Sequence, residues 1–537
     1  MQEKVQKMIR VRQVKINIEN DSINNIKIQT AKKLNIKPSD ILNIKINKQS
    51  IDARHKPEIY FLYEVDVTCN NESNILRKNK SNDILIKPNE EYKINVSGTK
   101  KLEKLVIVGA GPAGLMNAYI LASLGYKPLV IERGKKVEDR VKDVEEFFKT
   151  GILNTNSNVQ FGEGGAGTFS DGKLNTMVKD KEHRCKFIFK TLVECGAPED
   201  ILYAAKPHIG TDLLRNVIIN LRNKIISLGG EFRYNTCLTD INIINNEVSS
   251  IIVNNNEEIK CNCLVLALGH SSRDTFKMLY EKKLDMEAKP FAIGIRIQHP
   301  QSMINMSQIG VEKHDKLLNQ SYKLTYQTSK KRGVYTFCMC PGGYVVNSSS
   351  ENNMTCINGM SNHARESGNA NSAIIVTVNS NDFGNNPMDG INFQRELEKK
   401  AYEIGEGKIP TQLYGDFKNN KITKEFKEVK PKFKGDYKFA NINEILPNYI
   451  TEALIEGIEN FANKIKNYNR EDAIISAVEA RTSSPIKIIR DDLCQTKIIG
   501  IFPCGEGAGY AGGITSACMD GLKVAEGIVN IYNTPNI

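Results

Sequence analysis

The first hundred residues contain short runs in which apolar and polar positions follow a regular period. Residues 59–67 alternate strictly, as in a strand with one buried face, and residues 9–18 give a second strand with one slip of register. The apolar positions within residues 23–34 recur at helical spacing. This order predicts a small α+β domain of βαββ type over residues 1–100. Its last part, a Lys- and Asn-rich stretch from about residue 76, is expected to be a linker.

The pattern changes at Lys104, where short continuous apolar runs replace the alternation. The runs are LVIV at 105–108, LVLALG at 264–269 and IIGIFPCG at 498–505. Continuous apolar runs of this length are typical of parallel strands that are covered on both faces. We therefore predict an α/β fold with one Rossmann-like domain built from several parts of the chain.

A more polar region separates the second apolar run from the third. Residues 286–470 contain loop clusters such as SSSENNM and NSNDFGNNP. We expect an inserted α+β substrate domain there. The Rossmann-like domain would then comprise residues 101–285 and 471–537.

The first apolar run leads into a glycine motif. Gly109, Gly111 and Gly114 form GxGxxG between the strand and a helical segment, and Glu132 stands 18 residues after Gly114, at the end of the next strand. The first glycine allows the tight turn, the second lets a pyrophosphate approach the backbone, and the third allows close packing of helix and strand. The helix N-terminus attracts the phosphates. The acid, followed by Arg133, would bind ribose hydroxyls, so the motif predicts a dinucleotide site.

The C-terminal segment repeats the sequence of strand, glycine-rich turn and helix. Glu506 stands between Gly505 and Gly507, and Gly512 and Gly513 precede Ile514 and the last helix. An extended flavin dinucleotide needs a second set of contacts far from the first. The acid suits ribityl hydroxyls, and the helix N-terminus suits the flavin edge where negative charge collects on reduction. This second set indicates FAD as the cofactor.

Together these segments resemble the glutathione-reductase-like FAD/NAD(P)-binding flavoprotein superfamily. Within the resemblance, LVLALGHSSRD corresponds to a central strand ending at Gly269, and NVQFGEGGAGTFSDGKLNT to a glycine-rich loop that approaches the cofactor. That loop adds the candidate cofactor-binding residues Gly162, Gly164, Gly165, Gly167, Asp171 and Lys173.

Several blocks resemble more closely the bacterial uncharacterised FAD-dependent dehydrogenase family. They are SIDAR, FGEGGAGTFSDGKL, KPHIGTD, RGVYTFCMCPGG, NGMSNHAR, VEARTSSP and GEGAGYAGGI, and they span most of the chain. The resemblance implies FAD and a redox role. No second strand-GxGxxG-helix unit occurs between residues 180 and 470, so NAD(P)H is expected only as a transient donor.

Composition narrows the class of protein further. The chain has 537 residues, a net charge of +11 and 12 cysteines without a CxxC pair, and we interpret the charge as a general compositional bias. No secretory signal and no run of 18 apolar residues is evident, so we expect a cytoplasmic protein with reduced thiols and no membrane partner. Neither zinc spacing nor an HExxH motif is present, and no metal site is predicted.

Four residues are candidates for the chemistry. Arg481 could bind an anionic substrate or form a structural salt bridge, and Arg296 could point into a cavity or lie on a solvated strand face. Tyr335 is a candidate proton donor or a core aromatic residue, and Cys338 forms with Cys340 a CxC pair that is redox-active or simply buried.

Two further residues stand beside the predicted flavin. His270 is a candidate phosphate donor or proton relay, and the alternative is a hydrogen-bonded loop histidine. Cys504, directly before Gly505, is a candidate covalent attachment site.

The sequence thus predicts an FAD-dependent oxidoreductase, a dehydrogenase or reductase, that transfers hydride between a small-molecule substrate and flavin N5. One alternative is an FAD-dependent tRNA-modifying enzyme, since residues 424–439 interleave lysines with Phe426, Phe433 and Tyr437. A solvated loop is the expected reading of that stretch, so nucleic acid is not the expected partner. The other alternative is a non-catalytic flavin-binding electron-transfer or sensor protein.

Overall fold

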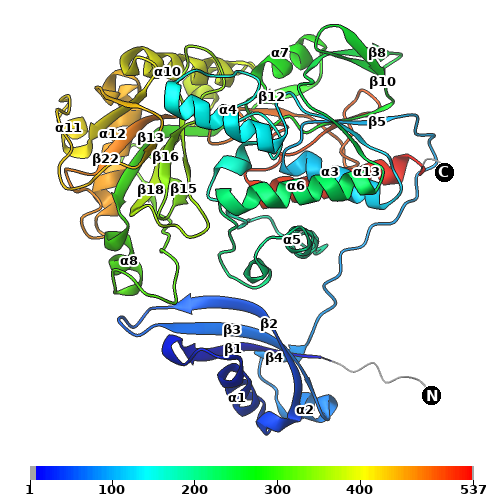
Figure 1. Ribbon diagram of the computed structural model, residues 1–537, viewed down its shortest axis with the longest axis vertical. Coiled ribbons are helices and arrows are strands. Elements are labelled where there is room, and N and C mark those ends of the chain that lie inside the picture. Colours follow the sequence, from blue (N-terminus) through cyan, green and yellow to red (C-terminus); the bar gives the residue numbers. More distant parts are fainter. Residues whose placement is uncertain (1–7, 535–537) are drawn as a thin grey trace.

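A computed structural model describes residues 8–534 of the chain. It contains a small N-terminal domain, a domain around a parallel sheet, and a large insert around an antiparallel sheet (Figure 1). Among the described residues, no helix combines the length and apolar character needed to cross a membrane.

The N-terminal domain is a four-stranded sheet in the order β2-β3-β1-β4, covered on one face by two helices. Its elements are β1 (Ile9–Asn17), α1 (Ile23–Leu34), β2 (Ile41–Asp52), β3 (Tyr60–Cys69), α2 (Glu72–Lys78) and β4 (Ile84–Ile86). The register of β1 against β3 shifts between Val11 and Val14. Both helices lie on the side of the sheet that faces away from the other domains (Figure 1).

The segment expected to be a linker begins later than residue 76. Helix α2 and strand β4 occupy its first part, because Ile75 and Ile84 are buried in the N-terminal core. The remaining stretch to β5 is held by polar contacts. Glu90 binds both Arg10 of β1 and, at 2.8 Å, Lys186 of the next domain.

The second domain is built on five parallel strands in the order β24-β11-β5-β6-β7. Its elements before the insert are β5 (Leu105–Val108), α3 (Pro112–Ser123), β6 (Leu129–Ile131), α4 (Val137–Thr150), α5 (Arg184–Glu194), α6 (Thr211–Ser227), β7 (Glu231–Arg233), β8 (Leu238–Ile244), β9 (Glu247–Val253), β10 (Glu257–Lys260), β11 (Cys263–Leu266), α7 (Arg273–Glu281) and β12 (Met286–Ala288). After the insert come β23 (Ile486–Ile488), β24 (Ile501–Pro503) and α13 (Ile514–Ile531). The three continuous apolar runs of the sequence are thus the three neighbouring strands β5, β11 and β24.

The parallel sheet is buried on both faces. Helices α3, α5, α6 and α13 pack on one face, against Leu105, Ile107 and Val265. The antiparallel strands β8, β9 and β10 and helix α7 cover the other face, against Val106 and Leu264. Burial of both faces explains why these strands lack polar alternation.

The insert is built on a seven-stranded sheet in the order β14-β15-β18-β13-β22-β19-β21. Its elements are β13 (Phe291–Pro300), α8 (Gln301–Ile309), β14 (Thr325–Gln327), β15 (Gly333–Cys340), β16 (Tyr344–Asn347), β17 (Ile357–Met360), β18 (Asn369–Val378), α9 (Ser380–Phe383), α10 (Asp389–Gly405), β19 (Ile409–Leu413), α11 (Tyr414–Lys418), β20 (Phe433–Lys434), β21 (Tyr437–Phe439), α12 (Asn448–Phe461) and β22 (Ile474–Glu479). Strand β22 pairs with β13 and β19 of this sheet, although the sequence placed residues from 471 onward in the parallel-sheet domain.

The two faces of the insert sheet carry different side chains, as strand β13 shows. Ile293, Ile295 and Ile297 point into the core beneath α10 and α12. Arg296 lies between them on the opposite face and is fully buried. That opposite face turns toward the parallel-sheet domain.

Candidate functional site

A cavity of about 350 Å³ lies between the loops that follow the parallel strands and the polar face of the insert sheet. The loops after β5, β6, β11 and β24 line one side. Phe337, Cys338, Asn358 and Glu479 of the insert line the other side. Ligands of parallel sheets bind at the carboxyl ends of the strands, and this cavity has that position.

The three glycines of the first motif have different surroundings. A Cβ placed on Gly109, which has φ +102°, would overlap the carbonyl oxygen of Ala267, and one on Gly114 would overlap that of Gly109. Gly111 lines the cavity instead, and the nearest atom to its Cβ position is the Cα of Gly165 at 3.8 Å. The first and third glycines therefore close the turn, whereas the second leaves room beside the N-terminus of α3.

Glu132 borders the cavity at the end of β6 and holds the neighbouring loops. Its carboxylate accepts hydrogen bonds from the backbone N–H groups of Ala110 at 2.9 Å and of Gly134 and Gly162 at 3.0 Å. Arg133 also lines the cavity. It donates to Asp274 at 3.1 Å and lies 4.4 Å from the centre of the Phe161 ring.

The glycine-rich middle loop lies against the first motif. Gly162, Gly165 and Gly167 line the cavity, whereas a Cβ on Gly164 would overlap the Thr168 hydroxyl. Asp171 and Lys173 line it as well, and Asp171 accepts a hydrogen bond from Arg365 of the insert at 2.8 Å.

Arg140 of α4, which the sequence reading did not single out, holds this middle loop in shape. Its buried guanidinium donates to five backbone carbonyls, those of Asn158, Val159, Gly162, Glu163 and Gly165. Burial lowers the pKa of the guanidinium to about 10, so it remains charged at neutral pH. Arg140 stands in the amphipathic segment after the second strand, where nothing distinguishes it from a surface arginine.

The C-terminal loop completes the same side of the cavity. Glu506 faces it, and so do Gly512, Gly513 and Ile514 at the start of α13. A Cβ on Gly512, Gly513 or Gly269 would meet no atom within 4 Å. Gly505 and Gly507 have packing roles, since a Cβ there would crowd Ala113 or overlap the Gly269 backbone.

His270 lies between these loops, with Nδ1 3.5 Å from Glu506 Oε1. Its Nε2 is buried and has no hydrogen-bond partner among the described residues. A buried polar atom at a cavity wall calls for a ligand, because an unpaired one costs about 1–3 kcal/mol. His270, Glu506 and the free glycine backbone thus fit a polar, extended molecule such as FAD.

Arg296 occupies neither of the two positions predicted from the sequence. Neither a solvated strand residue nor a cavity wall, it lies behind the wall and is 0% exposed. Its Nε donates to Glu479 at 2.9 Å, and Nη1 donates to Asn371 at 2.8 Å and to the Cys338 carbonyl at 3.1 Å. Arg296 therefore positions the residues that do reach the cavity.

Glu479 is a cavity residue that the sequence reading missed. It ends β22 and is 3% exposed, and burial raises the pKa of its carboxyl against the opposing charge of Arg296. The sequence feature that could have indicated Glu479 is its place directly after the mostly apolar strand segment Ile474–Val478. A buried carboxyl with a raised pKa in a cleft is typical of residues that hold or move a proton.

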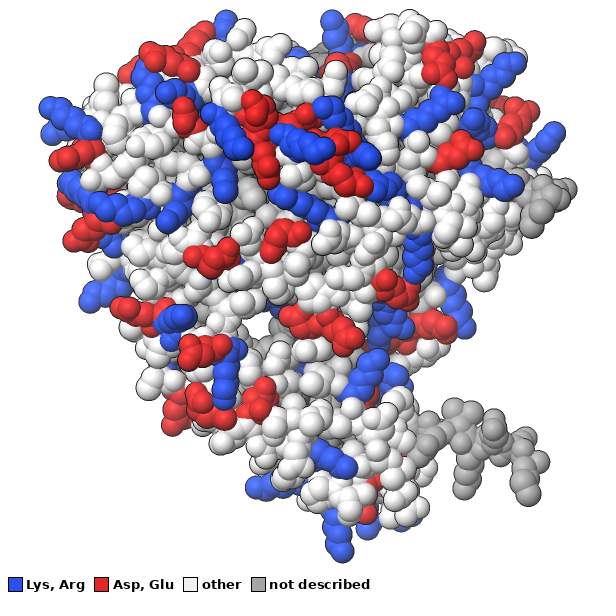
Figure 2. Space-filling model, in the orientation of Figure 1, with Lys and Arg blue, Asp and Glu red and all other residues white. Residues whose placement is uncertain are grey.

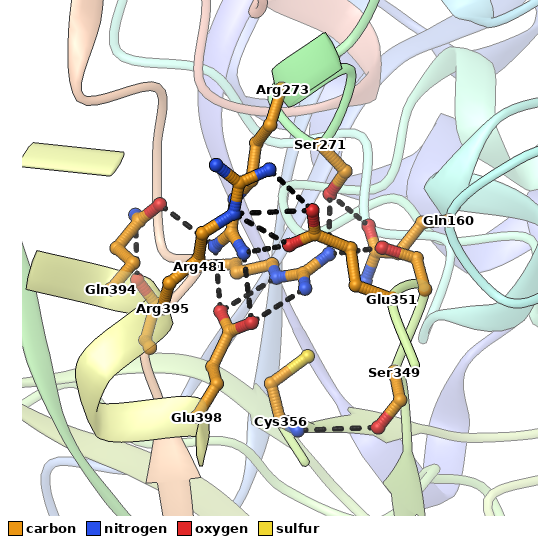
Figure 3. A network of polar contacts seen from close by, with 12 residues as sticks. Gln160, Ser271, Arg273, Ser349, Glu351, Cys356, Gln394, Arg395, Glu398 and Arg481 are labelled. Carbon is orange, nitrogen blue, oxygen red and sulfur yellow. Dashed lines mark hydrogen bonds and ion pairs between the residues drawn. The ribbon is translucent and has the colours of Figure 1, made fainter. Parts of the chain in front are cut away.

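Arg481 belongs to a buried ion network at the junction of the two domains (Figure 3). Its Nε and Nη2 bind the two oxygens of Glu398 of α10 at 2.8 and 2.7 Å, and Nη1 donates to Ser271 at 3.1 Å. Arg273 of α7 binds the same carboxylate at 2.7 and 2.9 Å. Although Arg481 lines the cavity, nearly all of its donors are used, which favours the structural salt bridge.

Two other candidates have clear surroundings. Tyr335 packs against Ala292, Ala373 and Ile375, and the cavity lining includes Phe337 but not Tyr335. Cys504 lines the cavity yet has a fully buried thiol, whose pKa burial raises well above its usual value.

The aromatic rings of the lysine-aromatic stretch partly cover one another, and Tyr437 is the one of the four that is exposed, at 40%. Phe426, Phe433, Tyr437 and Phe439 pack on one another, with neighbouring ring centres 4.9–5.7 Å apart. The positive charge is also dispersed. On the face shown in Figure 2, basic and acidic side chains alternate over all three domains.

Comparison with known proteins places these features in a family. Residues 290–482 match the domain described as FAD-dependent protein, C-terminal domain-like, residues 103–150 match the FAD binding domain, and residues 8–68 match a domain of unknown function. An uncharacterized protein of Clostridium beijerinckii is 48% identical over 534 residues, which cover 98% of this chain and 99% of that protein.

Solved structures resemble the chain only distantly. Glycine oxidase from Geobacillus kaustophilus is 10% identical with a TM-score of 0.35, and the match covers 81% of this chain and 96% of the oxidase. The quinol fumarate reductase subunit of E. coli is 12% identical with a TM-score of 0.33, covering 81% and 69%. At these scores the likeness says nothing about activity. The relative and the domain matches establish that the chain belongs to the family of the C. beijerinckii protein and that its cofactor is FAD.

Proposed function

We propose that the chain is an FAD-dependent oxidoreductase of the glutathione-reductase-like superfamily that transfers hydride between flavin N5 and a small-molecule substrate. The observation that supports this most is the continuity of the cavity. It runs from Gly111 and Glu132 past Glu506 and Gly513 to Cys338 and Glu479 of the insert. One space thus borders both glycine-rich loops and a wall with ionisable side chains.

The residues that would hold FAD divide between the two loops. Backbone N–H groups at the start of α3 would bind the pyrophosphate, and Glu132 would accept from ribose hydroxyls with its remaining lone pairs. His270 Nε2, Glu506 and the start of α13 at Gly513 would bind the flavin half. When bound, FAD supplies the hydride acceptor and donor.

The insert wall would bind and orient the substrate. Phe337 offers an apolar surface, and Asn358 and Glu479 offer polar groups beside it. Arg296 fixes one oxygen of Glu479, and the other has no hydrogen bond to the described residues. Glu479 would therefore take or return the proton that accompanies hydride transfer. A positioned acid or base of this kind contributes about 10²- to 10⁴-fold to a rate.

A small molecule fits this site better than RNA does. Of the aromatic rings that would stack on bases, three are partly covered by their neighbours and only Tyr437 is exposed. The insert wall lies inside a cavity between two domains. Single-stranded nucleic acid needs an open, charged groove with free aromatic rings.

Anaerobic mixing tests the proposal. Holoprotein is mixed with NADH, with NADPH and with the small-molecule fraction of a cell extract while the visible flavin band is followed. We expect at least one of them to bleach the flavin, and Glu479→Gln to slow that bleaching at unchanged flavin content. A flavin that none of the three reduces would contradict the proposal, as would an unchanged rate in Glu479→Gln.

A further inference from the structure

The end of strand β15 carries two cysteines in an irregular backbone. Pairing between β15 and β18 is interrupted between Phe337 and Cys340, and Cys338 has φ +42°. Residues other than glycine rarely adopt this left-handed backbone conformation, and those that are held in it cluster at functional sites. In a regular strand, residues two apart are about 6.6–6.8 Å apart along the chain. In the irregular segment the Cys340 thiol instead turns back to the Cys338 carbonyl, at 3.3 Å.

The two cysteines occupy different depths beside the same cavity. Cys338 lines the cavity, and Cys340 lies directly behind it and is fully buried. The Cys340 thiol donates to the Cys338 carbonyl at 3.3 Å, and Arg296 Nη1 donates to that carbonyl at 3.1 Å. Arg296, which also positions Glu479, therefore holds the segment that carries the two cysteines in place.

Their charge environment differs from that of the other buried cysteines. The neighbouring Cys340 thiol, helped by the positive charges of Lys173 and Arg296, lowers the pKa of the Cys338 thiol below its usual value against the effect of burial. The same contact and burial raise the pKa of Cys340 well above its usual value. For comparison, burial raises the pKa of Cys356 to about 11. The two shifts have opposite directions and favour a thiolate at Cys338 beside a protonated thiol at Cys340, the arrangement that thiol–disulfide exchange requires.

We propose that Cys338 and Cys340 form a redox-active dithiol that exchanges two electrons with the bound flavin, an inference that rests on the function proposed above. Counted from two neutral thiols, both S–H bonds break, one Sγ–Sγ bond forms, and two electrons and two protons pass to oxidised FAD. The reverse reaction consumes reduced FAD and restores the thiols. The chain therefore holds a second two-electron centre beside its cofactor.

An anaerobic reductive titration of the holoprotein counts these electrons. Protein is first oxidised with diamide, freed of reagent and titrated with dithionite while the flavin band is followed. We expect the wild type to take up four electrons per flavin, two for each centre. Cys338→Ser and Cys340→Ser should each take up two. Cys356→Ala, which removes a buried cysteine of the same domain that does not line the cavity, should take up four.

The outcomes separate the two proposals. A wild-type uptake of two electrons per flavin overturns the dithiol and leaves the flavin-dependent function standing. Failure to bind FAD at all overturns both. The two-electron outcome does not depend on whether the serine variants fold, and their flavin content shows whether their counts can be compared. Four electrons in a serine variant that retains its flavin would place the second centre elsewhere and overturn the dithiol.

Thiol labelling provides a second readout that needs no redox step. Reduced native protein is treated with iodoacetamide at a series of pH values, and the labelled peptides are counted by mass spectrometry. Half-maximal labelling of Cys338 is expected clearly below the pH at which a free thiol is labelled, with Cys356 unlabelled throughout. Labelling of Cys338 that rises only near pH 8.5, the ordinary range of a free thiol, contradicts the proposal.

Discussion

Arg296 and Glu479 form a buried ion pair across the neighbouring strands β13 and β22, with Arg296 Nε 2.9 Å from Glu479 Oε2. Arg296 is 0% exposed and Glu479 is 3% exposed. The same guanidinium holds the Cys338 carbonyl and Asn358. One buried arginine therefore fixes three parts of the insert wall relative to the cavity.

The energetics of this pair are testable. Removing one partner leaves an unpaired buried charge, so Arg296→Met and Glu479→Leu should each lower the free energy of unfolding by about 3–5 kcal/mol. The double variant should lose less than the sum of the two, because no charge remains uncompensated. Urea unfolding measures all three, and additive losses would show that the two side chains do not interact.

The glycines of the first motif should separate folding from cofactor binding. In Gly111→Ala the new Cβ enters the cavity without a clash, so we expect FAD affinity to fall about tenfold or more and apoprotein stability to change by less than about 0.5 kcal/mol. In Gly114→Ala the Cβ overlaps the Gly109 carbonyl, so we expect a loss of about 1–3 kcal/mol of stability.

FAD titration by fluorescence and urea unfolding of the apoproteins check this pair of variants. Equal effects of both variants on stability would contradict the assignment of Gly111 to the cavity and of Gly114 to packing.

His299 predicts a pH dependence of stability. Burial lowers its pKa to about 4, so between the ordinary value near 6.5 and pH 4 the unfolded chain binds a proton that the folded chain does not. This group therefore makes the fold less stable as pH falls through that window, by up to about 3 kcal/mol. In His299→Gln, which can keep the hydrogen bond to the Tyr468 carbonyl, the contribution is absent.

Urea unfolding at several pH values compares the two proteins. His208, whose pKa is also lowered to about 4, titrates in both and serves as an internal reference. The difference in stability between wild type and His299→Gln should shift in favour of the variant as pH falls. A difference independent of pH would refute the prediction.

Cys504 predicts how FAD is attached. Burial keeps its thiol protonated, and a protonated thiol is a poor nucleophile. We therefore expect acid precipitation to release all of the flavin into the supernatant, with the same result for Cys504→Ala. Flavin that stays with the precipitated wild-type chain and not with the variant would show a covalent bond at this residue.

The sequence could predict the features that depend on local spacing. The runs at 105–108, 264–269 and 498–505 became neighbouring parallel strands, since continuous apolar runs need burial on both faces. The positions of Gly109 and Gly114 follow from the tight turn that joins strand to helix. The sequence also indicates Cys338 and Arg296 as candidate site residues, but it does not predict the contact between Arg296 and the Cys338 carbonyl.

Features that depend on long-range packing could not be read in this way. Arg140 reaches five carbonyls only because the middle loop folds around it, and Arg481 meets Glu398 only where two domains join. Strand β22 lies beyond the expected end of the insert at residue 470, because strand order in an antiparallel sheet is not set by spacing along the chain. The role of Glu479 could not be predicted for the same reason, because its position at the cavity follows from the pairing of β22.

Hydrogen exchange of the apoprotein and the FAD-loaded protein tests the central claim, which is that one flavin spans both glycine-rich loops. FAD should slow exchange of the backbone amides in residues 109–114 and also in residues 505–514, with Gly111→Ala weakening both effects together. Protection confined to one of these segments, or found in neither, would contradict the account.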